Sequence, residues 1–271
     1  MIGITGNKFF GPRIVDNLKT KIGAEYFSPS LHDLRFKKKI EKLKIIHFIG
    51  SPTASLHGVL TLIRLRMWKK KIVVHWIGGD AWQVTNKKTL RLYTNLCKDK
   101  IDLHLADDER LASLLTKVGI DAAVQPLPVA NLYELEPLPT EKKFLVYLPD
   151  ETPYWWNRFN GEIIKKIVIE FPSINFIIIK NSGKFFNEHN VKCYKWVDDL
   201  HTIYKDVIGM IRIPIQDGLP GTMVELLSMG RHFIYSEKFP HCYKADTFEE
   251  LKNAINEIVT NTKLNRRGSL W

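Results

Sequence analysis

The sequence predicts an α/β protein with two doubly wound parallel sheets. Short apolar runs of strand length alternate with helical patterns along the chain, which is typical of βαβ units. The alternation stops over residues 133–143, where two prolines and mixed charges show no period, and then begins again. The 271 residues suffice for two domains of about 130 residues each. We therefore expect an amino-terminal domain over 1–132, a linker over 133–143 and a carboxy-terminal domain over 144–271.

Apolar runs locate the expected strands. In the first domain these runs cover residues 1–5, 25–27, 44–49, 72–77, 102–106 and 123–127. In the second domain they cover residues 144–148, 175–179, 192–194, 207–213 and 232–235. Turn residues or helical patterns follow these runs, so we expect parallel pairing with crossover helices.

Two helices have clear boundaries in the sequence. The helix after the fifth strand has apolar residues at i, i+3, i+4 and i+7 and a glycine stop: Leu111, Leu114, Leu115, Val118 and Gly119. Near the carboxyl end, Asp246 and Glu249 have the spacing of a capping box before an apolar stripe. The tail over 260–271 has no period. We expect it either to fray or to dock Leu270 and Trp271 on the other domain.

Composition excludes several classes of protein. With 45% hydrophobic and 25% charged residues, the chain has the apolar material of a globular protein and not of a disordered one. The three cysteines, Cys97, Cys193 and Cys242, provide neither a disulfide framework nor a zinc spacing. We expect no membrane-spanning segment and no signal peptide, because the apolar runs are too short. These features predict a cytoplasmic protein, either free or bound peripherally to the inner face of the membrane.

Positive charge is concentrated in the first half of the chain. Residues 1–132 contain 22 lysines and arginines against 11 acids, whereas residues 133–271 contain 18 of each. Basic segments at 35–44 and 64–71 supply much of this excess, and the second places Trp68 among cations. Such asymmetry indicates a polyanionic partner, either nucleic acid or an anionic membrane surface. Solvated helix faces are the alternative.

The loops after the strands are the places to look for a ligand, because parallel sheets bind ligands at the carboxyl ends of their strands. Asp217, Gly218, Gly221 and Thr222 lead into a helix that ends near Gly230. The amino-terminus of this helix favours a phosphate or diphosphate. One turn inside lies Glu225, whose carboxylate suits the vicinal hydroxyls of a ribose. A plain turn followed by a solvated glutamate is the alternative.

The stretch over 217–236, DGLPGTMVELLSMGRHFIYS, resembles the nucleotide-sugar signature of retaining GT-B glycosyltransferases of the family 4-like group. In that signature an acid, seven residues and a glutamate precede a small-residue helix; the family usually has glutamate where this chain has Asp217. KWVDDLHTIYKDV (195–207) is similar to the loop and short helix that cover the nucleotide base, and HWIGGDAW (75–82) to the loop that faces the donor sugar. The resemblance implies two Rossmann-like domains facing across a cleft.

The resemblance also implies roles in donor binding. Glu225 would hold the ribose hydroxyls, and Asp217 a hydroxyl of the donor sugar. The remaining donor-binding residues would surround the diphosphate and the base: Gly218, Gly221 and Thr222 at the phosphates, Arg158 and Lys180 as their cations, Trp196 and Val197 at the base, and Gly6, whose loop would approach the donor from the first domain.

Three residues are candidates for a direct part in catalysis: Asp80, His75 and Asp217. Asp80 follows two glycines, and His75 lies in an apolar strand where a packed core histidine is the alternative. The chain has no Asp-x-Asp pair to hold a cation, because Asp107–Asp108 and Asp198–Asp199 are adjacent pairs that more often cap helices. A helix amino-terminus with lysine or arginine would stabilise the leaving diphosphate, so we expect no metal and no cofactor beyond the donor.

These expectations together predict a glycosyltransferase of the hexosyltransferase type that acts with retention. The sequence does not identify the acceptor. A lipid-linked or membrane-associated acceptor would suit the basic first half of the chain. Two alternatives remain: a non-enzymatic nucleic-acid-binding protein, although the sequence has no helix-turn-helix, zinc or RNP motif, and an epimerase or another sugar-nucleotide enzyme.

Overall fold

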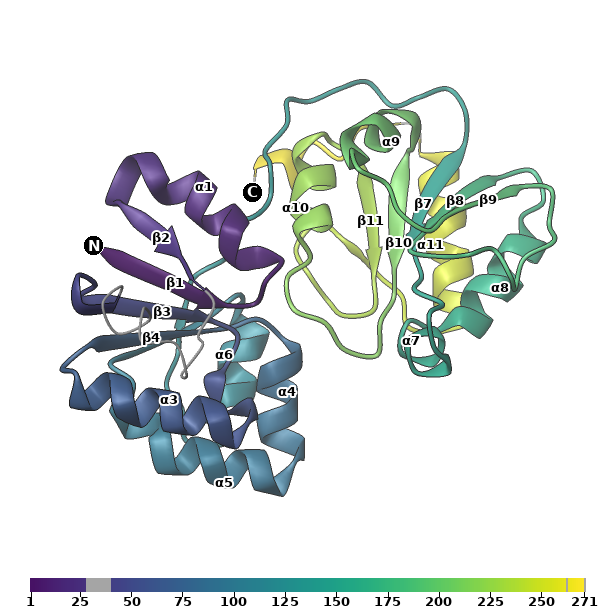
Figure 1. Cartoon of the computed structure of the whole chain (residues 1–271). Coiled ribbons are helices and arrows are strands. Elements are labelled where there is room, and N and C mark those ends of the chain that lie inside the picture. The colour runs from purple at the N-terminus through teal and green to yellow at the C-terminus, as the bar shows by residue number, and fades with distance from the viewer. Residues whose placement is uncertain (28–39, 262, 271) are drawn as a thin grey trace. The chain divides into compact units, whose positions relative to one another are not determined.

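The computed structural model describes residues 1–27, 40–261 and 263–270. It divides the chain into two compact units, one of residues 1–129 with 217–219 and one of residues 130–216 with 220–271. Each unit contains one six-stranded sheet in which all strands are parallel (Figure 1). The predicted α/β class with two parallel sheets is therefore confirmed. Residues 35–39 of the first basic segment and Trp271 lie outside the described residues.

The first sheet has the order β2-β1-β3-β4-β5-β6, so the chain starts in β1 and reverses direction across the sheet after β2. Its strands are β1 (Ile2–Gly6), β2 (Ala24–Tyr26), β3 (Ile45–Ile49), β4 (Lys71–Trp76), β5 (Leu103–Ala106) and β6 (Ala123–Val124). The carboxyl ends of β1 and β3 lie side by side at the point where the strand order reverses, which is where open parallel sheets bind ligands.

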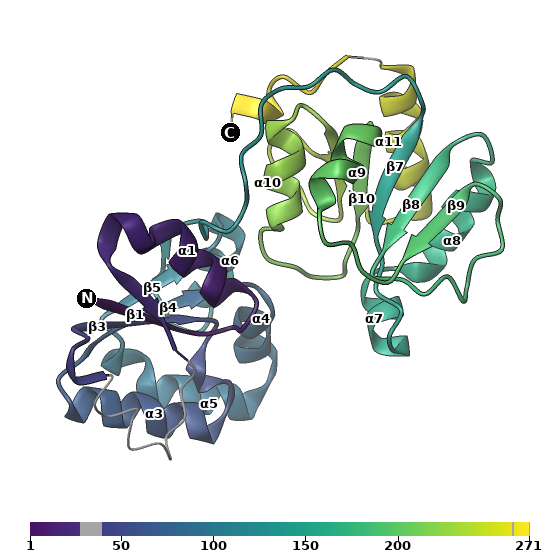
Figure 2. The ribbon, with the colours of Figure 1, turned by 45° about the horizontal axis from the view of Figure 1, so that its top comes forward.

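Helices cover both faces of the first sheet. They are α1 (Phe10–Ile22), α3 (Leu56–Met67), α4 (Gly79–Asn86), α5 (Lys88–Cys97) and α6 (Glu109–Thr116), with short 3-10 turns at Pro52–Ala54 and Lys98–Lys100. Figure 2 shows α1 on one face and α3 with α5 on the other. Apolar side chains of β3, β4 and α3 form the core between sheet and helices, among them Phe48, Trp76 and Leu62.

Helix α6 follows its sequence pattern closely. The carboxylate of Asp108 caps the helix by accepting a 3.0 Å hydrogen bond from the N–H of Leu111. Leu111 and Leu115 are buried, and Gly119 has a φ of +72°, a conformation that favours glycine. The predicted core face and the glycine stop of this helix are thus confirmed.

The second sheet has the order β12-β11-β10-β7-β8-β9. Its strands are β7 (Lys143–Tyr147), β8 (Asn175–Ile179), β9 (Val191–Tyr194), β10 (Gly209–Arg212), β11 (His232–Tyr235) and β12 (Tyr243–Lys244). The bounds of β8 and β11 are as predicted. The sequence pattern missed β12, because two residues are too few for a recognisable alternation. The chain reverses direction between β7 and β10, whose carboxyl ends form the switch point of this sheet.

The helices of the second unit are α7 (Pro153–Arg158), α8 (Gly161–Glu170), α9 (Leu200–Asp206), α10 (Gly221–Ser228) and α11 (Phe248–Thr260), followed by a 3-10 turn at Gly268–Leu270. Helices α8 and α11 pack against each other, and α10 packs against β10 and β11 (Figure 1). The capping box of α11 is formed by Thr247 and Glu250 and not by Asp246 and Glu249. Both pairs have the same spacing, so the sequence could not choose between them.

The segment expected to be a linker packs on the second unit. The side chain of Arg231 is 1% exposed, and its Nη1 donates hydrogen bonds of 2.8 and 3.0 Å to the carbonyl oxygens of Glu136 and Pro137. Its Nε donates a 3.0 Å bond to the carbonyl oxygen of Tyr204, so that one buried guanidinium joins this segment to α9. Arginine suits this role because its planar guanidinium has five N–H donors, which can bind several carbonyl oxygens at once.

The carboxy-terminal tail also packs on the second unit. The N–H of Asn265 donates a 2.9 Å hydrogen bond to the carbonyl oxygen of Gly230, and Leu264 lies beside that glycine. The side chain of Leu270 and all of Trp271 lie outside the described part of the chain. Within the described residues, no helix is long and apolar enough to span a membrane.

Candidate functional site

The loop between β10 and α10 lies at the switch point of the second sheet and is anchored there by residues that follow β7. Arg158, the last residue of α7, donates a 2.9 Å hydrogen bond from Nη2 to the carbonyl oxygen of Gln216 and accepts a 2.8 Å bond from the N–H of Ile215. Asn160 donates a 2.8 Å bond to the carbonyl oxygen of Ile213. The guanidinium of Arg158 thus holds the loop that precedes α10, and its predicted contact with a phosphate stays a prediction.

Helix α10 begins with Gly221 and Thr222, as predicted for a phosphate-binding helix start. Among the residues that the structure describes, no side chain caps this end of the helix, and its first turn contains no acid. The hydroxyl oxygen of Thr222 is buried and has no hydrogen-bond partner within the described residues. An uncapped amino-terminus carries partial positive charge and unused N–H donors, and the buried hydroxyl adds a further group that a ligand oxygen would satisfy.

Glu225 lies one turn inside α10, and both of its carboxylate oxygens are fixed by the protein. Oε2 accepts a 2.7 Å hydrogen bond from the hydroxyl of Tyr204 on α9, and Oε1 accepts a 3.1 Å bond from the N–H of Asn131. A carboxylate oxygen can accept two hydrogen bonds, so each oxygen retains capacity for a ligand hydroxyl. Burial, followed by the charge of Glu225, raises the pKa of Tyr204, which therefore stays protonated as the donor.

Aromatic residues surround this carboxylate and were not predicted. The ring of Tyr133 stacks on His201 with centroids 4.2 Å apart and meets Tyr204 edge-on at 6.3 Å. The N–H of Tyr133 donates a 3.0 Å hydrogen bond to the hydroxyl of Ser228 on α10. Tyr204 and His201 lie in the segment whose resemblance pointed to the nucleotide base, but only the tertiary contacts identify them. Tyr133 lies in the expected linker, where no sequence signal marked it.

Lys180 and Trp196, expected at the diphosphate and at the base, lie together after β8 and β9. The Nζ of Lys180 is 4.1 Å from the ring centroid of Trp196, which is a cation–π distance. Trp196 is exposed, and its Nε1 donates a 2.7 Å hydrogen bond to Asp198. Val197 follows, half-buried. Lys180 has a φ of +61°, which is uncommon for a residue with a side chain.

Asp217 and Gly218 are grouped with the first unit. The N–H of Gly218 donates a 3.0 Å hydrogen bond to Oδ1 of Asp217. A Cβ built on Gly218 would lie 2.5 Å from the carbonyl oxygen of Ile77, and one built on Gly78 would lie 2.6 Å from the nitrogen of Gly218. Neither glycine can be replaced without a backbone shift, because backbone atoms occupy the space of the side chain.

The first unit has its own cavity, of about 460 Å³, at the carboxyl ends of β1, β3 and β4. Gly6 and Asp80, which were predicted separately, both line it. Gly6 has a φ of +106°, and a Cβ there would collide with the carbonyl oxygen of Ile49. Apolar surface dominates the lining, and polar side chains interrupt it; they include Asn7, Ser51, Ser55, His57 and Gln83.

Asp80 joins the loops that form this cavity. Oδ2 accepts a 2.7 Å hydrogen bond from the N–H of Ser51, and Oδ1 accepts bonds of 3.0 and 2.9 Å from the N–H groups of Ile77 and Ala81. Burial raises the pKa of Asp80, against the effect of these three donors. A carboxylate that accepts three backbone bonds from two loops fixes the loops relative to each other.

His75 does not line the cavity. Its side chain is 1% exposed, and Nε2 lies 3.1 Å from Oδ1 of Asp107. The ring stacks on His47 with centroids 5.6 Å apart. Within the described residues, no three histidine, cysteine, aspartate or glutamate side chains come together in a way that could hold a metal ion.

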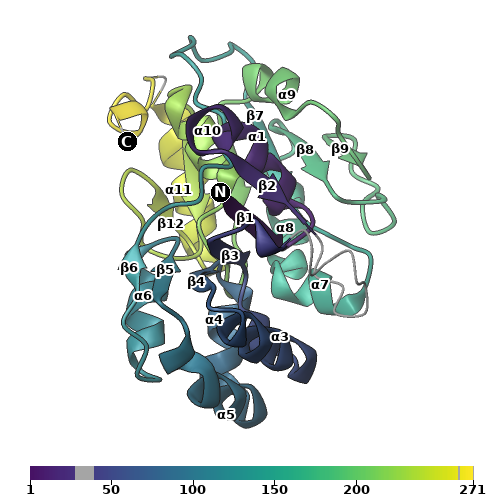
Figure 3. The same cartoon turned by 60° about the vertical axis from the view of Figure 1, so that its left-hand side comes forward.

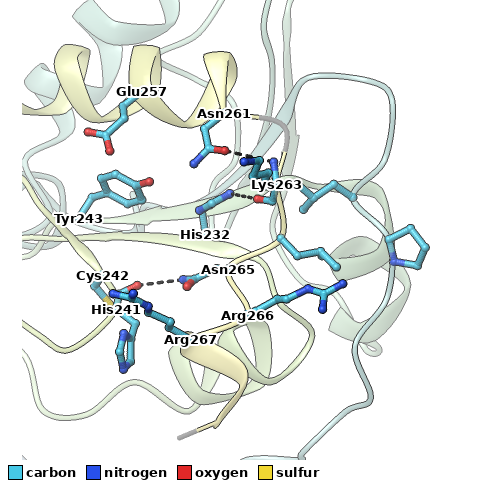
Figure 4. A pocket seen from close by; sticks show the side chains of 13 residues that line it. His232, His241, Cys242, Tyr243, Glu257, Asn261, Lys263, Asn265, Arg266 and Arg267 are labelled. Atoms are coloured by element: carbon cyan, nitrogen blue, oxygen red, sulfur yellow. Dashed lines mark hydrogen bonds between the residues drawn. The ribbon is translucent and has the colours of Figure 1, made fainter.

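A larger cavity, of about 990 Å³, lies away from these predicted residues. It is bounded by the carboxy-terminal tail, α11 and the starts of β11 and β12 (Figure 4). Lys263, Arg266 and Arg267 give it a basic character, and His232 in its wall is hydrogen-bonded to the carbonyl oxygen of Lys263 at 3.0 Å. None of the residues predicted for donor binding lines this cavity.

Comparison with known proteins gives structural matches only. No protein-family model matches the chain, and no curated protein matches its sequence. Sucrose-phosphate synthase from Thermosynechococcus elongatus superposes with a TM-score of 0.73 at 10% identity, over 99% of this chain and 93% of that one. HepE from Anabaena, solved in complex with UDP-glucose, gives a TM-score of 0.72 at 12% identity, over 99% and 92% of the two chains.

UDP-GlcNAc 2-epimerase from Neisseria meningitidis, bound to UDP-GlcNAc, also matches, with a TM-score of 0.59 at 10% identity over 99% of this chain and 93% of that one. At such identities the likeness concerns the fold. The chain therefore has the GT-B fold of nucleotide-sugar glycosyltransferases, as the sequence resemblance predicted.

Proposed function

We propose that this chain is a glycosyltransferase that takes its sugar from a nucleotide-sugar donor and that α10 binds the ribose and diphosphate of that donor. The observation that carries the proposal is the carboxylate of Glu225, which Tyr204 and Asn131 hold from opposite oxygens at 2.7 and 3.1 Å. A carboxylate fixed in this way can accept hydrogen bonds from two vicinal hydroxyls without first losing side-chain freedom. Ribose presents such a pair.

The amino-terminus of α10 would receive the diphosphate. Its uncapped N–H groups and the buried hydroxyl of Thr222 offer donors, and Lys180 offers a full positive charge. Trp196 and Val197 would contact the base, with the exposed ring of Trp196 as the stacking surface. HepE, whose fold this chain shares, was solved with UDP-glucose, so UDP-sugars are the first donors to test.

In the proposed reaction, the bond between the anomeric carbon and the diphosphate oxygen breaks as an acceptor hydroxyl oxygen bonds to that carbon. The leaving diphosphate keeps the electron pair and takes up the acceptor proton, so the positive end of α10 stabilises the charge that develops there. Retention of configuration and transfer without a metal belong to this proposal, together with a contact of Asp217 to the donor sugar. The acceptor supplies the attacking hydroxyl group.

In this proposal, Asp80 and His75 of the first unit have structural roles and do not transfer protons. Because three backbone N–H groups bind the carboxylate of Asp80, we assign it the positioning of the cavity loops that contain Ser51 and Ile77. The imidazole of His75 is enclosed beside Asp107, so we assign it to the packing of the sheet.

The test is donor binding by the purified chain and its Glu225→Ala variant. We expect UDP-, GDP- or ADP-sugars to raise the melting temperature of the wild type, and Glu225→Ala to weaken affinity for the active donor by at least about thirtyfold while the circular dichroism spectrum stays unchanged. Glu249→Ala, an exposed position on α11, is the matched control and should bind normally. Equal affinity of Glu225→Ala and wild type would refute the assigned role.

Nucleic-acid binding is the outcome that would replace the proposal. If no nucleotide sugar stabilises the chain and DNA or RNA binds with strong salt dependence, the basic first half and not α10 defines the function.

An epimerase is the second candidate, because the Neisseria meningitidis epimerase shares the fold over nearly the whole chain. Proton NMR separates the two reactions. A transferase releases nucleoside diphosphate and consumes donor only when an acceptor is present, apart from slow hydrolysis. An epimerase alone would invert a sugar carbon of the donor without acceptor. The anomeric configuration of a transfer product then reports retention directly.

A further inference from the structure

Helix α3 of the first unit exposes a row of apolar side chains. Its four outward residues have exposed fractions between 37% and 74%: Leu56, Leu60, Ile63 and Met67. Their spacing of four, three and four residues places them on one side of the helix. The opposite side is buried against the sheet through Val59, Leu62 and Leu65. We call the four outward residues the α3 stripe.

An exposed stripe of this kind needs an explanation. A helix that is apolar on both sides is normally buried on both sides, since exposed apolar surface is unfavourable in water. In α3 only the inner side is covered. Contiguous exposed apolar surface on an otherwise polar protein marks a docking surface for another molecule or for a membrane.

The surroundings of the α3 stripe are basic. Arg64 and Arg66 flank it, and Lys69 follows just after the helix; all three are exposed. Arg66 is paired with Asp102 at 2.8 Å, which leaves Arg64 and Lys69 as the stronger attraction for an anion. The sequence contains no acid between Glu41 and Asp80. Trp68, which the sequence suggested as the apolar residue among these cations, packs instead against the first core.

The neighbouring helix also exposes apolar side chains. Helix α5 packs against α3, and Figures 1 and 3 show the two side by side. It exposes Leu92 and Leu96, one turn apart, with exposed fractions of 58% and 59%. Lys88 and Arg91 on the same helix are also exposed. Two adjacent helices of the first unit thus combine outward apolar side chains with lysine and arginine.

We propose that this surface of α3 and α5 docks on an anionic lipid bilayer, with the apolar side chains entering the boundary of the acyl chains and Arg64 and Lys69 facing the headgroups. Both parts of a peripheral membrane site are present: apolar side chains to insert and cations to attract anionic lipid. This inference does not depend on the proposed transferase activity.

Two other partners fit less well. A second copy of the chain, paired through the same surface, would bring arginine and lysine against arginine and lysine, because a twofold interface is self-complementary. A nucleic acid would place charged phosphates against leucine and methionine, which cannot neutralise them or donate hydrogen bonds to them. Of these three occupants, the anionic bilayer is the one that satisfies the apolar and the basic residues together.

The test is sedimentation of the full chain with vesicles. One set contains phosphatidylcholine alone and the other also contains about one third phosphatidylglycerol. We expect binding to the anionic vesicles only. Leu60→Gln combined with Met67→Gln should reduce the vesicle partition coefficient at least about tenfold, since both residues would insert. Arg64→Gln combined with Lys69→Gln should reduce it severalfold and flatten its salt dependence.

The matched control lies on α8 of the second unit. Lys166→Gln combined with Ile169→Gln changes one exposed cation and one exposed apolar residue of an ordinary surface helix, and should bind vesicles like the wild type. Affinity for the nucleotide sugar should be unchanged in all three variants, which separates this inference from the proposed function.

Three results would overturn the inference. They are absence of binding to anionic vesicles by the wild type, equal binding by wild type and the Leu60/Met67 variant, and a wild-type dimer in light scattering that becomes a monomer in that variant. The last result would assign the stripe to an interface between copies. The Arg64/Lys69 variant keeps the test open if the Leu60/Met67 variant fails to fold.

Discussion

The hydroxyl of Tyr204 donates a 2.7 Å hydrogen bond to Oε2 of Glu225, and this contact links α9 to the helix proposed to bind the donor. The side chain of Tyr204 is fully buried, so water does not compete with Glu225 for its hydroxyl group. Asn131 holds the other carboxylate oxygen through its backbone N–H, which no side-chain substitution removes. Tyr204 is therefore the residue through which the orientation of Glu225 can be tested.

Tyr204→Phe should weaken donor binding without abolishing it. The variant removes one of two hydrogen bonds that orient Glu225, so we expect a loss in affinity of about threefold to tenfold and a loss in stability of about 1 kcal/mol. In a double-mutant cycle with Glu225→Ala, the two effects on affinity should be far from additive, because Tyr204 acts through Glu225. Isothermal titration calorimetry provides the measurement. Tyr194→Phe serves as control, and additive effects would contradict the argument.

Thr222→Val should separate stability from binding. The buried hydroxyl of Thr222 has no partner within the described residues, so its replacement by a methyl group of similar size should leave stability equal or raise it by up to about 1 kcal/mol. Affinity for the nucleotide diphosphate should fall about fivefold or more, because the ligand loses a donor. Thr222→Ser retains the hydroxyl and should retain affinity. A valine variant that binds as tightly as the wild type would show that the hydroxyl does not meet the ligand.

Asp80→Ala should destabilise the first unit strongly. Removing the carboxylate leaves three backbone N–H groups without their acceptor, and we expect a loss of about 3 kcal/mol or more in the free energy of unfolding. Urea denaturation followed by circular dichroism measures the loss. Asp99→Ala, at an exposed position, should change stability by less than about 0.5 kcal/mol. If Asp80→Ala were as stable as wild type but inactive, Asp80 would have a chemical role instead.

Acid should destabilise the first unit through His47. Burial, followed by the charge of His75, lowers the pKa of His47 to about 4. In the unfolded chain a histidine has a pKa of about 6.5, so between these values only the unfolded state takes up the proton. Stability should therefore be complete above about pH 6.5 and fall by up to about 3 kcal/mol as the pH approaches 4.

The measurement is the free energy of unfolding against pH for wild type and His47→Gln. The glutamine variant should lack this part of the pH dependence, whereas His189→Gln, at an exposed position, should retain it. Burial raises the pKa of Asp107, but that carboxyl is present in both proteins, so the difference between them reports His47. Identical slopes in wild type and His47→Gln would exclude the assignment.

The fold could be predicted because its signals are local. The residues of β8 and β11 are continuous apolar runs, and the apolar spacing of α6 shows its buried face directly. Errors occurred where a local signal was ambiguous or too short, as with the capping box of α11 and the two-residue strand β12. Strand order was not available from the sequence, because it depends on pairing between distant segments.

The candidate site, too, has features that the sequence predicted and features that only the tertiary structure shows. By itself the sequence determined that a helix start with Gly221 and Thr222 is followed by an acid one turn later, since these positions are neighbours along the chain. Only the tertiary structure decided which groups hold that acid, because Tyr204 and Asn131 lie 21 and 94 residues away from Glu225. The same holds for Asp80, whose carboxylate is bound by an N–H group 29 residues earlier. The composition and the apolar spacing of a segment indicate its secondary structure. The partners of a buried polar group depend on packing between distant segments, which no single segment encodes.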